Sequence, residues 1–369
     1  MEDYIMKKKW LAGLLSVAIV ATLLAGCGSS ANKSTTDGNA KEEQNTQEVK
    51  ELNIFTWDGM FPQEILDGFE METGIKINYS NFDTDEAMLA KLEETKGGEY
   101  DLVIADDYII ETVIAEGLAQ KLDTLKFDNY KNINPLFQGY FYDENNEYTI
   151  PHGAGVPVIV YDPNAVDVEI KSYADLWNPA LEDNVALIGN YRVINGITLK
   201  TMGESFNTND LTVIQSAGDK LLELAPNVRL VSDSNTQDYL ISGEAAVGFL
   251  YTSQAFTAVQ NNPDLKVVYP EEGLGFGIMA GFIPSNAPHA DAAYQFLDYI
   301  LDAKNGAKCF EYLGYYCTNK AAEQYIDEHL KESLVLPAGT EKGEIIMNVS
   351  AEAEELHSKI WTKFLSACE

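Results

Sequence analysis

The fold is decided by residues 52–115, which read LNIFTWDGMFPQEILDGFEMETGIKINYSNFDTDEAMLAKLEETKGGEYDLVIADDYIIETVIA. Apolar and polar residues alternate over 52–56 and again over 75–79, and a short apolar run occupies 102–105. We expect these three stretches to be strands, and each precedes a stretch with one apolar face, which is typical of a helix. Strand and helix therefore alternate, which predicts an α/β fold with a mainly parallel sheet.

Helix boundary signals support this order. Pro62 suits the first turn of a helix, Gly74 can end that helix, and Thr84 can cap the next one. A second alternation of strands and helices follows, and then a helical C-terminal part. In these two parts of the chain the expected strands are 156–160, 185–188, 245–250 and 276–283. The expected helices are 174–177, about 190–202, 211–224, a helix after 251, 289–303, 303–313, 320–331 and 350–367.

Polar and aromatic residues lie directly after two of the first strands. Trp57 and Asp58 follow the first strand, and Asp106, Asp107 and Tyr108 follow the third. Ligands of parallel α/β sheets bind beyond the carboxyl ends of the strands. These five residues are therefore candidate ligand contacts.

The composition limits the classes of partner. The chain has 369 residues, 58 of them acidic and 25 basic, and a formal net charge of −33. Hydrophobic residues make up 46%, enough for a large core, and the length suggests two domains. Binding to nucleic acid or to anionic lipid needs clustered Lys and Arg, so this charge argues against both. It permits a cationic ligand, although a well-solvated surface is the simpler explanation of the charge alone.

Residues 1–26 have the pattern of an export signal. Three lysines at 7–9 precede an apolar stretch that is too short and too interrupted for a membrane span. The stretch ends in Leu-Ala-Gly-Cys, which resembles the lipobox of bacterial lipoproteins and implies that Cys27 carries a lipid. The alternative is a cleaved secretory signal with a coincidental cysteine. The start is either Met1 or Met6.

Residues 27–49 are expected to be a flexible tether behind the lipid anchor. The stretch is rich in small and polar residues and has no aromatic residue, so it cannot bury a face. An anchor, a tether and a large folded body describe a protein on the outer face of the cytoplasmic membrane, attached to the membrane by lipid only.

Cysteine and histidine spacing predicts no metal site, and no cofactor is expected. Cys309, Cys317 and Cys368 form no C-x-x-C, and the four histidines are scattered. Outside the cytoplasm a disulfide between Cys309 and Cys317 is one option, and burial of these side chains as small hydrophobic groups is the other.

Catalytic motifs are also missing from the sequence. It has no Gly-rich phosphate loop, no GxSxG and no dinucleotide-binding glycine pattern after a strand. An acid pair such as Asp106 and Asp107 could serve a glycosidase, but adjacent side chains diverge on most backbones. The sequence therefore predicts a protein that is not an enzyme, with a secreted hydrolase as the rival hypothesis.

An ordered series of short blocks resembles the spermidine/putrescine-binding proteins of bacterial ABC transporters. The blocks follow the family's order from about 51 to 360, nearly the whole body of the chain. In this sequence they read LNIFTW (52–57), FEMETGIKI (69–77), MLAKL (88–92), YDLV (100–103), YTIP (148–151), SYADLW (172–177), GEAAVG (243–248), IPSNA (283–287) and LGY (313–315).

The resemblance implies a two-lobed, periplasmic-binding-protein-like fold of class II, with the ligand in a cleft between lobes joined by crossover strands. The first lobe is expected to comprise 50–155 and about 276–325. The second is expected to comprise about 156–275 and about 326–369. The chain would cross between the lobes near positions 155, 275 and 325.

The resemblance also implies a kind of binding site. The family holds a polyamine between aromatic faces and caps its ammonium groups with carboxylates, which suits a desolvated cation. Trp57, Tyr108 and Tyr251 match aromatic positions of the family. Asp58 and Asp106 fall where the family often has hydroxyl side chains.

Simpler explanations stay open for several of these residues. Trp57 and Tyr251 also fit packing positions, and either Asp106 or Asp107 fits the cap of the helix that follows. Arg192 is either a clamp for a ligand carboxylate or a surface residue at a helix start.

The sequence departs from the family's pattern at several positions. The family's second-lobe acids fall at about Asn190 and Val193 and the acid of its return strand falls near Met279, and none of these is an acid. The family's aromatic residue on the return strand falls near Gly277, and a polar residue near the C-terminus falls at about Met347 or Asn348. The candidate ligand-binding residues are Trp57, Asp58, Asp106, Asp107, Tyr108, Asn190, Arg192, Tyr251 and Met279.

Together these features predict a substrate-binding lipoprotein of an ABC importer that captures a polyamine or a related small organic cation. The expected partners are permease subunits and a cytoplasmic ATPase, and the protein itself is expected to be a monomer. A long triamine is expected to bind weakly, because the far acids are missing, unless its far end meets Asp233 or Glu244. The alternative ligand is a zwitterionic amino compound.

Overall fold

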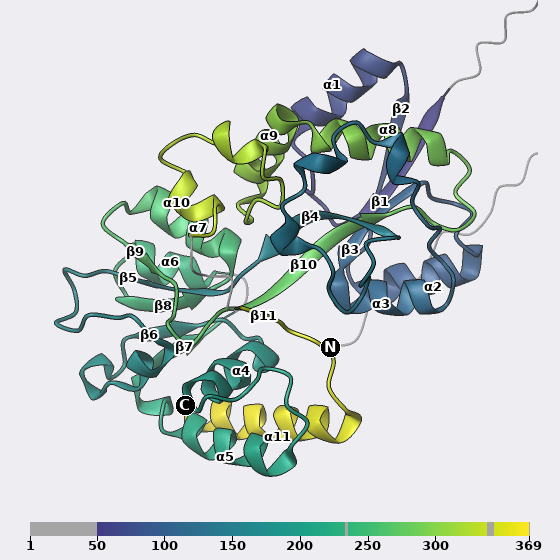
Figure 1. Cartoon of the computed structure of the whole chain (residues 1–369). Helices are drawn as coiled ribbons and strands as arrows, with labels where there is room; N and C mark the ends of the chain where they lie inside the picture. The colour runs from purple at the N-terminus through teal and green to yellow at the C-terminus, as the bar shows by residue number, and fades with distance from the viewer. Residues whose placement is uncertain (1–49, 233–234, 338–342, 369) are drawn as a thin grey trace, which may run out of the picture. The chain divides into compact units, whose positions relative to one another are not determined.

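The computed structural model describes residues 50–232, 235–337 and 343–368, which form two mixed sheets with helices packed around them (Figure 1). The strands are β1 (Glu51–Thr56), β2 (Lys76–Asn81), β3 (Leu102–Asp106), β4 (Thr149–Gly155), β5 (Val158–Tyr161), β6 (Val185–Leu187), β7 (Val228–Val231), β8 (Val247–Leu250), β9 (Lys266–Val268), β10 (Gly275–Phe282) and β11 (Glu344–Ile345).

Helices connect most of these strands. The α-helices are α1 (Gln63–Thr73), α2 (Asp85–Thr95), α3 (Asp107–Ala115), α4 (Tyr191–Thr201), α5 (Leu211–Leu222), α6 (Thr236–Ile241), α7 (Thr252–Asn261), α8 (Ala290–Leu301), α9 (Ala303–Leu313), α10 (Lys331–Leu334) and α11 (Ala351–Ala367). The alternation predicted from the first residues of the fold is therefore confirmed.

The helix boundaries in the first part follow the signals in the sequence. Pro62 directly precedes α1, and Gly74 ends it in the left-handed region at φ 71°, where a residue without Cβ is not strained. The Thr84 hydroxyl accepts a hydrogen bond from the backbone N–H of Ala87 at 3.2 Å and so caps α2.

The first sheet has the strand order β11-β10-β3-β1-β2, and β4 pairs with β10. β1 runs parallel to both β2 and β3, as the β-α-β-α-β order predicts. β10 is antiparallel to both β3 and β4. Because β1, β2 and β3 are parallel, their carboxyl ends meet at the same edge of this sheet.

The second sheet has the order β7-β6-β8-β5-β9. β6 is parallel to β7 and β8, whereas β5 is antiparallel to β8 and β9. In Figure 1, α4, α5 and α11 lie together on one side of this sheet. Both sheets therefore have a parallel α/β part, with two reversed strands in the first sheet, β10 and β11, and one in the second, β5.

Three connections join the elements of the two sheets. The chain passes from β4 to β5 through Val156 and Pro157, and it returns from β9 to β10. It then places β11 beside β10 before α11 packs on α4 and α5. The exact lobe boundaries stay a prediction.

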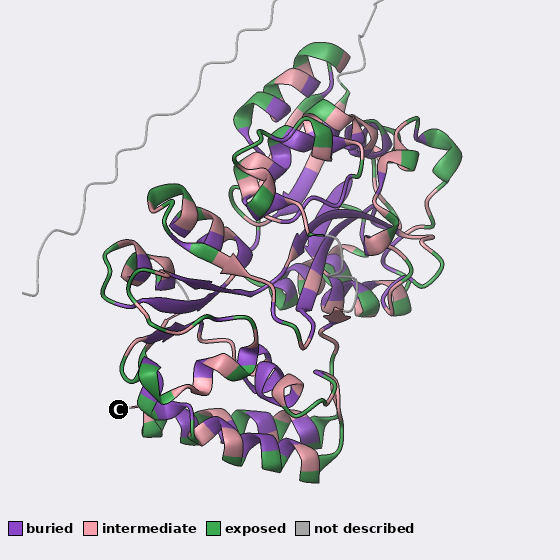
Figure 2. Cartoon of the chain, turned by 60° about the vertical axis from the view of Figure 1, so that its left-hand side comes forward, coloured by how far each residue is buried: buried purple, intermediate pink, exposed green. Residues whose placement is uncertain are grey.

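Buried side chains lie along the strands of both sheets and on the inner faces of the helices (Figure 2). The core of the first sheet includes Phe55, Val103 and Phe282, and that of the second includes Leu187 and Phe249. None of the helices in the described ranges is long and apolar enough to cross a membrane.

The C-terminal part differs from one expectation. The predicted helix over 320–331 is wrong, because the chain forms a single 3₁₀ turn at Ala322–Gln324 and then α10. The backbone N–H of Asp327, inside this stretch, donates to the Glu311 Oε1 atom at 2.7 Å and not to the helical carbonyl four residues earlier.

The cysteines follow one of the two alternatives. Cys309 and Cys317 are buried and not joined by a disulfide, and Cys368 is also a free thiol. Burial raises the pKa of the Cys309 thiol to about 12. Within the described residues the cysteines therefore act as small hydrophobic groups.

Candidate functional site

Two adjoining cavities lie between the elements of the first sheet and those of the second. The small cavity, of about 270 Å³, is lined on one side by Asp106 and Asp107 and on the other by Asn190, Val193 and Tyr251. It therefore has walls from both halves of the fold, as a cleft between two lobes requires.

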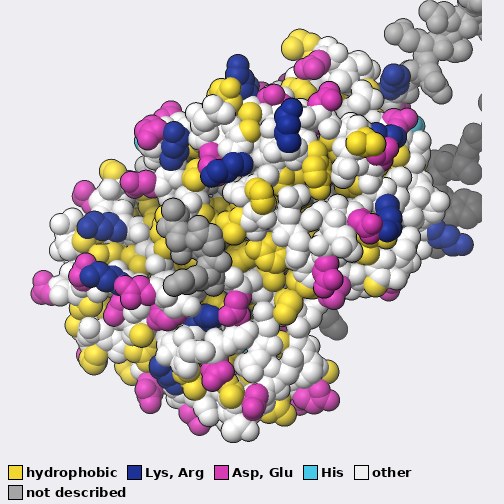
Figure 3. All heavy atoms as spheres, viewed as in Figure 1, with side chains coloured by type: hydrophobic (Ala, Val, Ile, Leu, Met, Phe, Trp, Pro, Cys, Tyr) yellow, Lys and Arg dark blue, Asp and Glu magenta, His cyan; other side chains and the backbone are white. Residues whose placement is uncertain are grey.

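The large cavity, of about 860 Å³, is lined by residues that include Trp57. Asp106, Tyr108, Met279 and Tyr315 line both cavities, so the two form one continuous cleft. On the face shown in Figure 3, hydrophobic side chains gather across the middle of the surface, where Figure 1 shows β10 and β11, and charged side chains lie mostly around them.

Three parallel strands deliver acidic side chains to this cleft. Asp58 follows the end of β1, Asp85 begins the helix after β2, and Asp106 is the last residue of β3. Since these strands are parallel and adjacent, their carboxyl ends bring all three residues to one edge of the sheet. The cleft is therefore acidic on the side of the first sheet.

Asp106 is held at the junction of the two cavities. It stands at the N-cap position of α3, yet its side chain makes no capping hydrogen bond with the described residues. In the sheet register it lies opposite Met279 of β10. Burial, and then the nearby Asp85 and Asp107, raise the pKa of the Asp106 carboxyl well above its ordinary value. This geometry argues against the alternative that Asp106 is only a helix cap.

Asp107 has a structural partner. Its side chain is 4% exposed, and Oδ2 accepts a hydrogen bond from the backbone N–H of Ile278 at 2.7 Å. Burial raises the pKa of the Asp107 carboxyl to about 7, although this hydrogen bond opposes the rise. Asp107 therefore links α3 to β10. A ligand in the cleft can use only the acceptor positions of Asp107 that this hydrogen bond leaves open.

Asp85 is an unusually placed acid. It is 4% exposed, and its Oδ1 atom is buried with no hydrogen-bond partner in the part of the chain that the structure describes. Burial raises the pKa of the Asp85 carboxyl to about 6, and the charge of Glu86 adds to the effect, whereas hydrogen bonds from Tyr108 and Asp106 lower it. A buried carboxylate with an unused oxygen is a strong acceptor for a cationic group.

Aromatic rings border these acids. The ring of Trp57 is half-buried and packs edge-on against Phe82, with ring centroids 4.9 Å apart. The ring of Tyr315 lies against β4, where a Cβ at Gly155 would come within 3.4 Å of its Cε1 atom. The Tyr108 hydroxyl donates to Glu86 Oε1 at 3.2 Å. The cleft thus combines carboxylates with ring faces, the two groups that attract a cation.

The opposite wall of the cleft is polar but carries no acid among the described residues that line it. Asn190 caps α4, because its side-chain oxygen accepts from the Val193 N–H at 3.1 Å. Tyr251 is half-buried at the N-cap position of α7. The Thr252 hydroxyl donates to the Val156 carbonyl at 2.9 Å and fixes the start of α7 against the first crossover.

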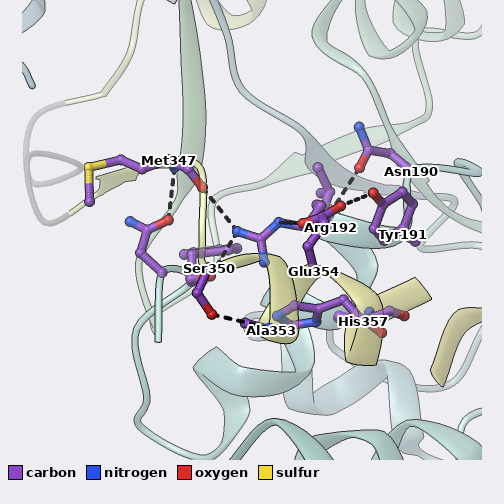
Figure 4. Close-up of polar contacts among 12 residues, drawn as sticks. Asn190, Tyr191, Arg192, Met347, Ser350, Ala353, Glu354 and His357 are labelled. Atoms are coloured by element: carbon purple, nitrogen blue, oxygen red, sulfur yellow. Dashed lines mark hydrogen bonds and ion pairs between the residues drawn. The ribbon is translucent and has the colours of Figure 1, made fainter. Parts of the chain in front are cut away.

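Arg192 lines the small cavity but is tied to the elements behind it (Figure 4). Its Nη2 atom donates to the Met347 carbonyl at 3.1 Å and to the Phe206 carbonyl at 3.5 Å. Its Nε atom lies 3.7 Å from Glu354 Oε2, and its side chain is 13% exposed. Glu354 in turn accepts a hydrogen bond from the Tyr191 hydroxyl. The guanidinium therefore joins α4 to α11 and to the segment before it, and its Nη1 atom, which is buried with no hydrogen-bond partner among the described residues, keeps donor capacity for a ligand anion.

The structure brings all nine candidate residues to the cleft, and their role as ligand contacts stays a prediction. Trp57 and Asp58 line the large cavity, whereas Glu244 is exposed and lines neither cavity. Asp233 lies outside the described residues. Those that line the small cavity are Asp106, Asp107, Tyr108, Asn190, Arg192, Tyr251 and Met279.

The charged and aromatic residues of the cleft that sequence reasoning missed are Asp83, Asp85, Glu86, Phe276, Tyr312 and Tyr315. Asp85 and Glu86 carried a usable signal, because they follow the second of three parallel strands just as Asp106 follows the third. After the second strand, the sequence analysis assigned a role only to Thr84, as the cap of the helix that follows. Tyr315 belongs to a block that resembles the family, but nothing in its sequence position points to a cleft.

In residues 50–232, 235–337 and 343–368, no group of three or more His, Cys, Asp and Glu side chains is placed to hold a metal ion. The acids of the cleft are spread over three strand ends, which suits an extended organic cation better than a compact ion.

Comparisons with known proteins agree with this architecture. Residues 64–335 match the model of the family described as bacterial extracellular solute-binding protein. The spermidine/putrescine-binding periplasmic protein of Salmonella typhimurium is 31% identical over 360 residues, which cover 96% of this chain and 99% of that protein. The spermidine/putrescine-binding periplasmic protein 1 of Haemophilus influenzae is 30% identical over 93% of both chains.

A solved structure has the same fold. The crystal structure of the spermidine/putrescine ABC transporter substrate-binding protein from Streptococcus pneumoniae superposes with a TM-score of 0.81 at 28% identity, over 87% of this chain and all of that one. The two-lobed periplasmic-binding-protein-like fold expected from the resemblance is thus confirmed. With a family model that matches most of its length and relatives at about 30% identity, the chain belongs to the bacterial extracellular solute-binding proteins.

Proposed function

We propose that this protein is the extracytoplasmic binding component of an ABC importer and captures a polyamine or a related small organic cation. The observation that carries the proposal is the meeting of Asp58, Asp85 and Asp106 at one edge of a sheet beside Trp57 and Tyr315. Carboxylates and ring faces together compensate an ammonium group for its lost hydration. The names of the relatives, which bind spermidine and putrescine, point to the same class of ligand.

Binding in such a cleft requires no chemical step. The family consists of solute-binding proteins, so the chain is not an enzyme and the secreted-hydrolase hypothesis is not supported. Three connections join the two halves of the fold, which is an arrangement that allows closure around a ligand by a hinge. The closed form then docks on permease subunits that a cytoplasmic ATPase drives, and the protein acts as a monomer.

A thermal-shift screen tests the proposed ligand class. A ligand that binds only the native state raises the melting temperature by mass action, so we expect small primary amines to raise it and neutral sugars to leave it unchanged. The emission of Trp57 should change in the same titrations, because its ring lines the large cavity. Trp57→Phe removes this signal and serves as the control. A melting temperature that no amine shifts would refute the proposal.

Anchoring by lipid at Cys27 is part of the proposed localisation on the outer face of the cytoplasmic membrane. Cys27 lies outside the described residues, and the export signal and the Leu-Ala-Gly-Cys ending support this assignment. We expect the Cys27→Ser form to appear mainly in the soluble fraction of fractionated cells, whereas the wild-type chain sediments with membranes. A Cys368→Ser form is the matched control and should stay with the membranes. Equal sedimentation of all three would contradict the lipid anchor.

A further inference from the structure

The charges of the cleft are distributed unevenly. All acids that line it belong to the half built around the first sheet, within the part of the chain that the structure describes. They are Asp58, Asp83, Asp85, Glu86, Asp106 and Asp107. An ammonium group therefore has acceptors at one end of the cleft only.

The strongest acceptor at this end is the pair formed by Asp85 and Asp106. Asp85 is almost fully buried, and its Oδ1 atom has no partner among the described residues. Asp106 makes no capping bond there and lies where the two cavities join. The remaining nearby acid, Asp107, already accepts from Ile278. The two carboxyl groups hydrogen-bond to each other, and Asp85 Oδ1 remains to accept from a cationic donor. Each member of the pair raises the cost of ionising the other.

The far wall of the small cavity offers an ammonium group nothing comparable. Val156, Pro157, Val193 and Ile346 present apolar surface there. Asn190 already uses its side-chain oxygen to cap α4. A second ammonium group on this wall would be desolvated without a charged partner, which costs several kcal/mol.

Arg192 makes this wall still less favourable for a second positive charge. Its guanidinium is a fixed cation at the cavity lining. Towards a ligand carboxylate it keeps donor capacity at Nη1 only, because Nη2 donates to the carbonyls of Met347 and Phe206 and Glu354 lies beside Nε, whereas Nη1 is buried with no hydrogen-bond partner among the described residues. A second ammonium group is therefore disfavoured at this end.

We propose that the cleft selects an amine with a single ammonium group, which binds between Asp85 and Asp106, while the rest of the ligand, which carries no second positive charge, extends into the small cavity. The proposal rests on the proposed function, capture of a small organic cation, and narrows its ligand class. It assigns Asp85, which was not among the candidate residues from the sequence, to the ammonium site. It also explains how a protein with the fold of polyamine-binding relatives can lack acids on its second wall.

Competition calorimetry on the wild-type chain tests the proposal with ligands that share a four-carbon chain and differ in the group at its far end. The series is n-butylamine, 4-amino-1-butanol, 1,4-diaminobutane and 4-aminobutanoate, with spermidine added as a triamine. We expect one of the two monoamines or the zwitterion to bind at least tenfold more tightly than the diamine and the triamine. A diamine or triamine that binds as tightly or more tightly overturns the inference and leaves the proposed function intact. Binding of none of the five overturns both.

A second measurement adds a carboxylate to the far wall of the small cavity and compares the affinities for a diamine and a monoamine. Asn190→Asp keeps a good N-cap for α4 and adds a carboxylate to the small cavity, so the fold should be preserved. We expect the ratio of diamine to monoamine affinity to rise at least threefold. Asn190→Ser caps the helix without a charge and should leave the ratio unchanged. A ratio that does not respond to Asn190→Asp would show that the missing carboxylate does not decide the ligand class.

Discussion

Replacing Asp106 by Asn should weaken amine binding by about a hundredfold, the largest effect that we expect from one substitution. Asn has the same shape, so the change removes a charged acceptor from the junction of the two cavities without opening space. A hydrogen bond to a charged group contributes about 1.5–3 kcal/mol, and each 1.4 kcal/mol changes affinity tenfold. Calorimetric titration with n-butylamine at pH 8 measures the loss directly.

The stability of the variant separates a binding role from a structural one. The Asp106 carboxyl is costly to ionise in its buried position, so Asp106→Asn should leave the melting temperature of the free protein unchanged or raise it at pH 8. Asp128→Asn, an exposed aspartate outside both cavities, is the matched control and should bind as the wild type does. If Asp106→Asn binds n-butylamine normally, Asp106 is not an ammonium ligand.

The residues of the site that belong to the first sheet could be predicted, because their positions follow from the order of strands and helices along the chain. Parallel strands end at one edge, so residues just after β1 and β3 had to meet there, as Trp57 and Asp106 do. The same rule applied to β2 would have found Asp85. Its burial could not have been predicted, because it results from the packing of α2 against α3 and not from any property of the local sequence.

The other half depends on contacts between residues far apart in the chain. Arg192 bonds to the carbonyl of Met347, which is 155 residues away, so its sequence position at a helix start could not show that it joins α4 to α11. Asp327, within the expected helix over 320–331, donates its backbone N–H to the Glu311 side chain, a pairing that is equally invisible in the sequence. Periodicity therefore predicted which elements form, and side-chain pairing over long separations decided where some of them stop.

The affinity for a monoamine should rise about tenfold between pH 5 and pH 8. In the free protein the pKa of Asp85 is about 6, well above its ordinary value, so most of this carboxyl is protonated at pH 5. An ammonium group binds the ionised form, and binding must release the proton at low pH. The ligand keeps its own charge over this range, since primary amines titrate near pH 10. Calorimetry in two buffers of different ionisation enthalpy would measure both the affinity and the protons released.

The stability of the free protein should fall as the pH rises, whereas the affinity for a monoamine should increase. These opposite signs distinguish an ammonium site at Asp85 from a general effect of pH on the protein. The raised pKa values of Asp85 and Asp107, about 6 and about 7, mean that the folded state holds more protons than the unfolded state between about pH 4 and pH 7. Their contribution to stability is therefore fully present below about pH 4 and is lost as the pH rises through 6 to 7. Asp85→Asn should flatten the affinity profile and remove the Asp85 part of the stability profile, because Asn resembles protonated Asp85 at every pH, whereas the Asp107 part should remain. Asp128→Asn should keep both profiles. An affinity that is independent of pH in the wild-type chain would remove Asp85 from the ammonium site.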